Sequence, residues 1–428
     1  MDDQLPIITV TGTKGKTTTV AIVSDILHSL GKNVLKVDTT GHFVNGKRRS
    51  TLQDSKDAWR LVPSVCPGRY LWEFHANPKL REEGVAVLES SLGSSAASGL
   101  GYRYHHVGVF LNVFEDHIGS SDRIQSKADI AKAKDFIFSR LDPYSGYAVF
   151  NADDQYVAST LDMIPTSLRR AERMVPVGLT FEHFELDEHL RQGGVAITAE
   201  NGCVVLRSAV GDRVIASLGK IPWTFNGSFT PSVWNIISAV GALYAYFAGE
   251  FPDNFRAALE AVRLDKYGGR LTLLENDNKV KILADYAHEK VSLAMVADLA
   301  RTMIAKNGRV IGVVRLAHDR TDNLMRETGR VVGKSYDELV VYEKIDGYWR
   351  QPKPTGMRFP QVIGRTSEIF AGAIKEVNPN VTRILREDEA LAHAAELAQP
   401  GDVVVVIVND DIERSIGFIK EKFHADFI

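Results

Sequence analysis

The sequence predicts an α/β fold made of two successive units, each built around a parallel sheet, and three observations predict it. Near the N-terminus, the β-branched run at residues 7–10 leads through a glycine-rich loop into a helical pattern. Short apolar runs then alternate with helix-sized spans as far as about Asp154. A second alternation of the same kind starts near Leu271. Such alternation is typical of parallel sheets covered by helices on both faces.

The loop after the first strand has the composition of a phosphate cradle. Glycines between a strand and a helix let backbone N–H groups approach phosphate oxygens, and the helix N-terminus adds the positive end of its dipole. In this pattern Lys16 contacts the β- and γ-phosphates, and the Thr17 hydroxyl binds Mg²⁺. Val10 stands where the general pattern has its first glycine, so an ordinary glycine turn before a helix is the alternative. The predicted nucleotide-binding residues of the loop are Gly12, Thr13, Lys14, Gly15, Lys16, Thr17 and Thr18.

Composition limits the class of protein. The 428 residues suit two or three domains, and 44% hydrophobic with 25% charged residues is typical of a globular protein in water. A net charge of −3 gives no overall basic field, so we expect no nucleic-acid partner. No apolar run approaches the ~20 residues that span a bilayer. Because the first strand begins within a few residues of the N-terminus, we expect no signal peptide. Two widely separated cysteines, Cys66 and Cys203, are expected to be free thiols in a reducing cytoplasm. The sequence leaves homo-oligomerisation open.

The first predicted domain covers residues 1–264. Its strands are expected at residues 34–37, 85–88, 107–111 and 147–150, in addition to the first. Between residues 182 and 225 the pattern changes to short strands broken by glycine, which predicts a small antiparallel β appendage. An alanine-rich apolar stretch at residues 233–247 predicts a buried helix.

The second predicted domain covers residues 271–428 and is expected to be Rossmann-like. Strands at residues 281–284, 310–314, 338–341 and 403–408 alternate with helical spans such as 291–305 and 387–397. The polar, glycine-bearing residues 265–270 between the two domains are the predicted hinge.

Four other places carry chemistry. Glu89 directly follows a predicted central strand, where a carboxylate can join Thr17 in binding Mg²⁺ or can cap a helix. His117 closes an acidic cluster after the next strand and is either a site residue or a structural histidine. Lys132 and Lys134 lie on a predicted helix, whose lysines are most often solvated. The sequence of residues 285–288, directly after a predicted strand, is by itself only weak evidence for a functional site.

The order of these motifs along the chain is specific. Taken together they resemble the Mur ligase superfamily over nearly the whole length, and most of all the Mur-ligase-like C-terminal half of cyanophycin synthetases. Residues 312–330 also resemble the third domain of cyanophycin synthetases. The landmarks are T-G-T-K-G-K-T-T at residues 11–18, V-L-E-S at 87–90, L-N-V-x-E-D-H at 111–117, G-Y-A-V-x-N-A-D-D at 146–154 and D-Y-A-H at 285–288.

The resemblance implies an enzyme that makes amide bonds. Members transfer the ATP γ-phosphoryl group to a carboxylate, and an amine then attacks the acyl phosphate. By motif, Lys16 holds the phosphates, Thr17 and Glu89 hold one Mg²⁺, and His117 helps to hold a second. Lys134 aligns with a lysine that many members carbamylate, with Lys132 as a near alternative. ATP and Mg²⁺ are therefore the expected cofactors.

The resemblance also implies nucleotide contacts from later residues. Asn235 matches an adenine-contacting asparagine, Asp285 matches a ribose-binding aspartate, and His288 lies in the same nucleotide-facing segment. Arg270, beside the hinge glycines, matches an arginine that reaches the γ-phosphate when the domains close.

Two departures restrict what the resemblance implies. Glu289 and Lys290 replace the Asn-Pro that usually follows D-Y-A-H. Because the sequence begins at the strand of the phosphate loop, we expect neither the UDP-muramoyl domain of Mur ligases nor the ATP-grasp half of cyanophycin synthetases. The expected partners are therefore a carboxylate acceptor, small molecule or peptide, and an amine such as an amino acid. A folylpolyglutamate-synthase-like ligase and a degenerate nucleotide-binding partner subunit are the alternatives.

Overall fold

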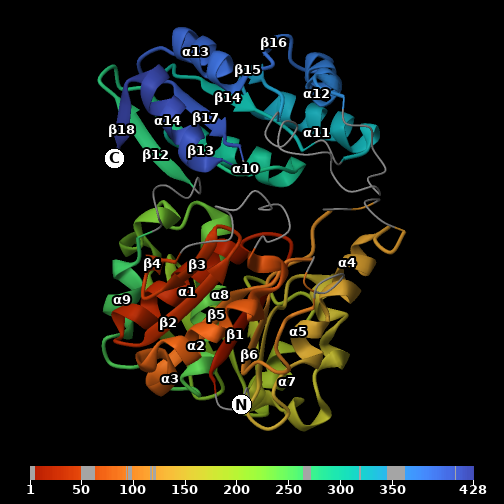
Figure 1. Ribbon diagram of the computed structural model, residues 1–428, viewed down its shortest axis with the longest axis vertical. Helices are drawn as coiled ribbons and strands as arrows, with labels where there is room; N and C mark the ends of the chain where they lie inside the picture. The colour runs from red at the N-terminus through yellow and green to blue at the C-terminus, as the bar shows by residue number, and fades with distance from the viewer. Residues whose placement is uncertain are drawn as a thin grey trace. The chain divides into compact units, whose positions relative to one another are not determined.

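The computed structural model describes residues 5–49, 63–92, 94, 99–115, 118, 122–263, 271–317, 320–344, 362–409 and 411–428. The chain divides into two compact units (Figure 1). The first unit comprises Met1–Phe114 and Ser126–Arg263, and the second comprises Glu115–Gln125 and Leu264–Ile428. The predicted hinge, residues 265–270, lies outside the described residues.

The described strands of the first unit form one 11-stranded sheet, in the order β11-β10-β9-β8-β7-β6-β1-β5-β2-β3-β4. The seven strands from β9 to β2 in that order are parallel, and antiparallel strands extend the sheet at both edges. The strands are β1 (Ile7–Thr11), β2 (Asn33–Asp38), β3 (Gly41–Val44), β4 (Lys47–Arg48), β5 (Gly84–Glu89), β6 (Val107–Phe110), β7 (Tyr147–Asn151), β8 (Met174–Val177), β9 (Val195–Glu200), β10 (Cys203–Ser208) and β11 (Arg213–Ser217).

Helices cover this sheet on both faces. The long helices α1 and α8 contact each other and the central strands. Alternate side chains of the strands point the other way, where Leu35 and Val37 of β2 join a core cluster with Phe74 of α2 and Leu80 of α3. The helices are α1 (Lys16–Ser29), α2 (Glu73–Ala76), α3 (Pro78–Glu83), α4 (Lys127–Lys134), α5 (Phe136–Ser139), α6 (Gln155–Ala158), α7 (Leu186–Arg191), α8 (Thr230–Tyr246) and α9 (Phe255–Ala261).

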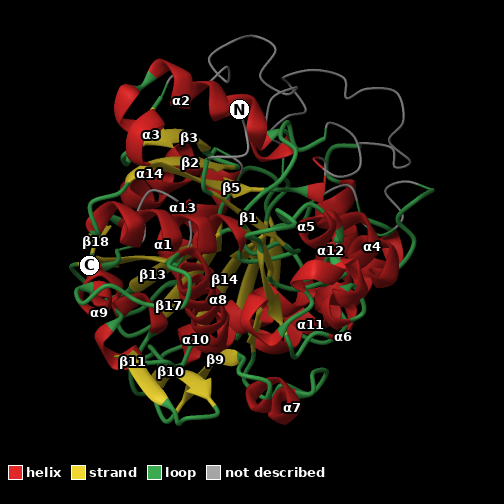
Figure 2. Cartoon of the chain, turned by 90° about the horizontal axis from the view of Figure 1, so that it is seen from below, coloured by secondary structure: helices red, strands yellow, loops and turns green. Residues whose placement is uncertain are grey.

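The residues expected to form a small β appendage continue the main sheet. Strands β9, β10 and β11 are antiparallel to one another, as the glycine-broken pattern predicts. One residue pair, Val177 with Ile197, joins β9 to β8 in parallel. These three strands therefore form an edge of the 11-stranded sheet (Figure 2).

The second unit has a seven-stranded sheet in the order β16-β15-β14-β17-β13-β12-β18. Its first five strands in that order are parallel, and β12 and β18 are antiparallel additions. The strands are β12 (Thr272–Asn276), β13 (Lys281–Asp285), β14 (Val310–Val314), β15 (Glu338–Val341), β16 (Val381–Arg383), β17 (Val403–Ile407) and β18 (Ala425–Phe427). The helices are α10 (Lys290–Arg301), α11 (Asp322–Ser335), α12 (Arg365–Lys375), α13 (Glu387–Leu397) and α14 (Ile412–Phe423).

Chain order places a topological switch in this second sheet. The chain passes from β13 to β14 and only later returns to insert β17 between them. Helices α10, α11 and α12 pack in sequence on one another, while α13 and α14 form a separate pair. The predicted α/β class is therefore confirmed for both units. Among the described residues, no helix is long and apolar enough to cross a membrane.

Candidate active site

The glycine-rich loop joins β1 to α1 in a conformation that favours glycine at two positions. Gly12 has φ 146° and Gly15 has φ 80°, both in the region that L side chains rarely adopt. Gly15 is the N-cap of α1, where no side chain caps the helix. A Cβ on Gly15 would overlap Oδ1 of Asn235, so a larger residue here would force the loop or the Asn235 side chain to move. The loop therefore brings its backbone N–H groups to a helix N-terminus, the arrangement that binds phosphate.

Asn112, which follows β6, forms hydrogen bonds with this loop. Its backbone oxygen accepts from the Thr13 N–H at 2.9 Å, and its Oδ1 accepts from the Lys14 N–H at 2.8 Å. Its Nδ2 donates to the Lys14 oxygen at 3.2 Å, and the N–H of Phe114 donates to Oγ1 of Thr13 at 3.1 Å. Asn112 is not among the predicted site residues, although it lies within the L-N-V-x-E-D-H motif. Lys16 also lies against the loop, since its Nζ donates to the Thr13 oxygen at 2.9 Å.

Glu89 is the buried carboxylate beside the loop. It ends β5, which pairs in parallel with β1, and only 2% of the residue is exposed. Thr17 Oγ1 donates to its Oε2 at 2.8 Å, and Thr39 Oγ1 donates to its Oε1 at 2.8 Å. Thr39 is not among the site residues predicted from the sequence. Carboxylate and hydroxyl oxygens are hard donors that suit Mg²⁺, so this pair fits a site completed by water and phosphate oxygens.

Of the two candidate lysines on α4, the structure buries Lys134 and exposes Lys132. Nζ of Lys134 lies 3.4 Å from Oγ1 of Thr11, and that hydroxyl donates to the Ser90 oxygen at 2.9 Å. Lys134 therefore points at the carboxyl ends of β1 and β5, where the loop and Glu89 also lie.

Asn235 and Thr18 complete the described group in the first unit. Asn235 lies in α8, and its Oδ1 is 3.4 Å from Oγ1 of Thr19. Thr18 lies half-buried in the first turn of α1. The first unit thus brings together the seven loop residues, Glu89, Lys134 and Asn235.

Asp285 and His288 lie at the carboxyl end of β13 in the second unit. Oδ2 of Asp285 accepts from the Leu271 N–H at 3.0 Å. Nδ1 of His288 lies 2.9 Å from the Tyr286 oxygen, and the two rings meet edge to face with centroids 5.5 Å apart. This end of a parallel strand, beside a topological switch, is where α/β sheets bind ligands.

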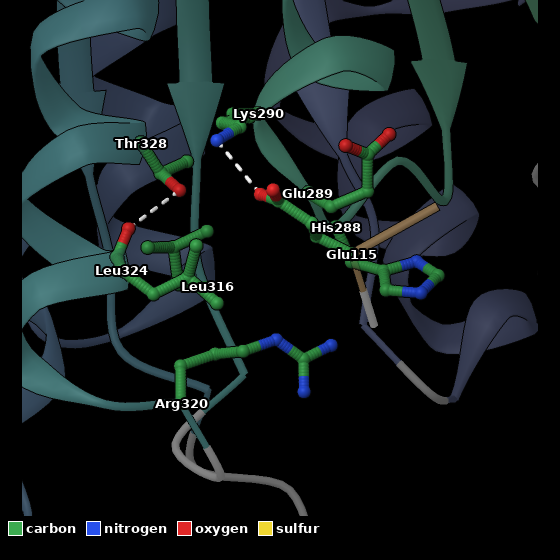
Figure 3. Close-up of a pocket in the computed structure, with 8 residues that line it drawn as sticks. All are labelled: Glu115, His288, Glu289, Lys290, Leu316, Arg320, Leu324 and Thr328. Carbon is green, nitrogen blue, oxygen red and sulfur yellow. Dashed lines mark hydrogen bonds and ion pairs between the residues drawn. The ribbon is translucent and has the colours of Figure 1, made fainter. Parts of the chain in front are cut away.

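The two residues that replace the usual Asn-Pro have defined structural roles. Glu289 caps α10, because its carboxylate accepts from the N–H groups of Val291 at 2.8 Å and Ser292 at 2.6 Å. Nζ of Lys290 forms an ion pair with Oε2 of Glu115 at 2.8 Å (Figure 3). The same Nζ lies 3.6 Å from Oε2 of Glu327. The hydrogen bond between Lys290 and the Glu115 carboxylate raises the pKa of Lys290 above its ordinary value.

A cavity of about 10 Å³ adjoins this ion pair, about the room for one water molecule. It is too small for a nucleotide or an amino acid. Its lining residues are Glu115, His288, Glu289, Lys290, Leu316, Arg320, Leu324 and Thr328 (Figure 3).

Two predicted site residues, His117 and Arg270, lie outside the described residues. Within the described part of the chain, no group of three or more His, Cys, Asp and Glu side chains could hold a metal ion. Among the described residues, the candidate Mg²⁺ site is therefore the Thr17 hydroxyl with the Glu89 carboxylate. One carboxylate is sufficient, because Mg²⁺ commonly binds only one or two protein carboxylates.

Fold and site together define a two-unit α/β protein with a phosphate-binding loop. Residues 10–171 match the model of the Mur ligase middle domain, and residues 269–407 match that of the Mur ligase, glutamate ligase domain. The chain belongs to the Mur ligase family.

Individual relatives agree with this assignment. Cyanophycin synthetase of Nostoc sp. (strain PCC 7120) is 30% identical over 97% of this chain and 42% of its own length. The UDP-N-acetylmuramoyl-L-alanyl-D-glutamate–2,6-diaminopimelate ligase of Corynebacterium efficiens is 26% identical over 94% of this chain and 68% of its own length. Among solved structures, E. coli FolC in complex with ADP has a TM-score of 0.65 at 17% identity, covering 97% of this chain and 90% of FolC. The chain thus spans less than half the length of the cyanophycin synthetases that it matches.

Proposed function

We propose that this chain is an ATP-dependent, ADP-forming ligase that joins an amino acid or similar amine to a carboxylate acceptor through an acyl phosphate. The observation that carries the proposal is the Thr17–Glu89 contact of 2.8 Å beside the glycine loop at the start of α1. Similarity to cyanophycin synthetases over 97% of this chain supports ligase chemistry of that kind. The acceptor and the amine do not follow from it, because the match covers 42% of the relative.

The proposed reaction brings the triphosphate and the acceptor carboxylate together, which concentrates negative charge in one site. The protein can stabilise this charge with cationic side chains and N–H dipoles that are already in position. Lys16 and the N–H groups at the start of α1 bind the phosphates of ATP. Thr17 and Glu89 would hold Mg²⁺, which supplies charge neutralisation at the β- and γ-phosphates. This role is supported by the burial of Glu89 and by the hydroxyl hydrogen bonds that its two oxygens accept at 2.8 Å, one of them from Thr17.

The proposed reaction has two steps. An oxygen of the acceptor carboxylate attacks the γ-phosphorus, the bond to the bridging oxygen breaks, and ADP leaves. The amine nitrogen then attacks the acyl carbon, the carbon–oxygen bond to phosphate breaks, and the nitrogen loses a proton. Exclusion of water matters because water would otherwise hydrolyse the acyl phosphate.

The remaining roles rest on the family motifs. We assign Lys134, as a carbamate, and His117 to a second metal ion, and Asn235 to adenine. Asp285 and His288 are assigned to the nucleotide, and Arg270 to the γ-phosphate.

Phosphate release from ATP tests the proposal. Purified protein is incubated with ATP, Mg²⁺, a panel of amino acids and a panel of acidic small molecules and peptides. We expect release that requires both an amine and an acceptor, with one amide formed per phosphate. Lys16→Met should lower the rate about 100-fold or more, whereas the exposed Lys79→Met should not. ATP hydrolysis without amide formation under every pairing would contradict the ligase assignment.

A further inference from the structure

An ion pair joins Glu115 to the start of α10 within the second unit. Nζ of Lys290, on the first residue of α10, lies 2.8 Å from Oε2 of Glu115. A second carboxylate, Glu327 of α11, lies 3.6 Å from the same Nζ. The side chains of Lys290 and Glu115 are 29% and 39% exposed, so water screens the pair only in part.

The backbone of Lys290 is held in place by the preceding residue, Glu289. Glu289 caps the first turn of α10 through two N–H groups, at 2.8 and 2.6 Å. α10 in turn packs on α11, which carries Glu327. The lysine therefore extends from a constrained helix start toward both carboxylates.

Glu115 continues directly from the stretch that holds the phosphate loop. The preceding residue, Phe114, donates its N–H to Thr13 at 3.1 Å. Asn112 binds the backbone of Thr13 and Lys14 at 2.8 to 3.2 Å. Between Phe114 and Glu115 the chain passes from the first unit to the second. A restraint on Glu115 is thus separated from the loop by one peptide bond and one hydrogen bond.

We infer that Lys290 is a positioning residue for nucleotide binding, which acts through Glu115 and the 112–114 backbone on Thr13 and Lys14 of the phosphate loop. The inference rests on the proposed function, because it assumes that the loop binds ATP. Proline, the usual family residue at this position, has no charge and could not form this ion pair. We therefore expect this positioning effect only in chains that carry a cation at the position of Lys290. A half-exposed ion pair supports a change in affinity of roughly 1.5- to 5-fold.

Nucleotide affinity is the first readout. The Kd of Mg²⁺-ADP is measured by calorimetry at low salt for the full chain. We expect Lys290→Met to raise the Kd roughly 1.5- to 5-fold and Lys290→Arg to restore most of the affinity. Glu115→Gln should raise it similarly, and the double variant should be no weaker than either single variant.

A matched lysine supplies the control. Lys279 pairs with Glu275 at 2.9 Å in the same unit, in the hairpin at the amino end of β13. Lys279→Met removes an ion pair of the same kind that has no connection to the phosphate loop. We expect it to leave the Kd of Mg²⁺-ADP unchanged.

Amide exchange is the second readout and needs no nucleotide. The Phe114 amide, bonded to Thr13, should exchange faster in Lys290→Met than in the wild type and in Lys279→Met. Equal Kd values or equal Phe114 exchange in wild type and Lys290→Met would overturn the inference. A wild-type protein that binds no Mg²⁺-ADP would instead refute the proposed function, while Phe114 exchange would still report whether Lys290 restrains this stretch.

Discussion

Glu89 is the residue whose charge has the clearest predicted consequence. Glu89→Gln keeps the shape and one carbonyl oxygen but removes the charge that would attract Mg²⁺. We expect the Mg²⁺ concentration for half-maximal phosphate release to rise about tenfold or more. The control is Glu83→Gln, an exposed residue at the end of α3. Superimposable Mg²⁺ titrations of Glu89→Gln and wild type would return Glu89 to a purely structural role.

His105 links stability to pH. The residue is fully buried, its Nε2 lies 2.7 Å from the Ile137 oxygen, and its Nδ1 has no partner among the described residues. Burial lowers the pKa of His105 from 6.5 to about 4, against a smaller opposing effect of Ile137. The folded protein thus favours the neutral ring, so this stabilisation is complete above pH 6.5 and falls as the pH drops toward 4.

The pH effect of His105 can be isolated by difference. Free energies of unfolding in urea are measured near pH 7 and near pH 4.5 for wild type and His105→Gln. We expect the loss between these pH values to be about 2–3 kcal/mol smaller in the variant, which retains an N–H donor for Ile137. The same acid sensitivity in both proteins would show that His105 is not the group responsible.

Lys134 has a matched neighbour that separates chemistry from helix effects. A carbamate forms reversibly on an uncharged amine, so Lys134→Ala should lose activity that a short carboxylic acid in the buffer partly restores. Lys132→Ala, on the exposed side of α4, should remain active without additive. Loss of activity without rescue, or equal loss in both variants, would argue against a carbamate at Lys134.

At the scale of elements, α1 offers two glycines with nearly the same φ and different surroundings. Gly15 at its N-cap has φ 80°, and Gly31 after its end has φ 84°. A Cβ would lie 2.2 Å from Asn235 at the first position, whereas no described atom lies within 4 Å at the second. Gly31→Ala should therefore cost only the backbone strain, about 1 kcal/mol of unfolding free energy, with nucleotide affinity unchanged.

Gly15→Ala should cost more stability than Gly31→Ala and should also weaken Mg²⁺-ADP binding about tenfold or more, because the loop must move away from Asn235. Urea unfolding and calorimetry check the two effects separately. If the two variants behaved alike, the close approach of Asn235 would have no role in shaping the loop.

The elements that the sequence predicts are those with a local signal. β1, the loop and α1 are predictable because an apolar β-branched run, glycines and a helical spacing follow one another. Glu89 is predictable because the carboxyl ends of parallel strands share one edge of a sheet. Thr39 is not, since its approach to Glu89 depends on the turn between β2 and β3 and on the pairing of β2 with β5.

Long-range pairing explains what the sequence leaves out. β18 pairs with β12 although about 150 residues separate them, and neither has a pattern that indicates the partner. The same applies to the β8–β9 pairing that joins the expected appendage to the main sheet. The grouping of residues 115–125 with the second unit depends on contacts such as the Lys290–Glu115 ion pair, which alternation of strands and helices does not encode.

At the scale of the whole molecule, each unit has a core cluster of its own. In the first unit Leu35, Val37 and Leu88 belong to one cluster, whereas in the second unit Ile282 and Val404 belong to another. Ligand binding to one core therefore need not stabilise the other equally. The predicted nucleotide residues are divided in the same way, with the phosphate loop in the first unit and Asp285 in the second.

Mg²⁺-ADP should consequently stabilise both units in the wild type and only the first unit in Asp285→Ala. At about 100 times its Kd the nucleotide adds about 2.7 kcal/mol to the unit that binds it, which slows exchange of the core amides of β1 and α1. Core amides of β13 and β17 gain protection only if Asp285 binds the same nucleotide. The exposed Asp277→Ala, in the hairpin before β13, is the matched control and should behave as wild type. Protection of β13 and β17 that survives in Asp285→Ala would remove the ribose role of Asp285, and absence of protection in β1 and α1 would remove the phosphate role of the loop.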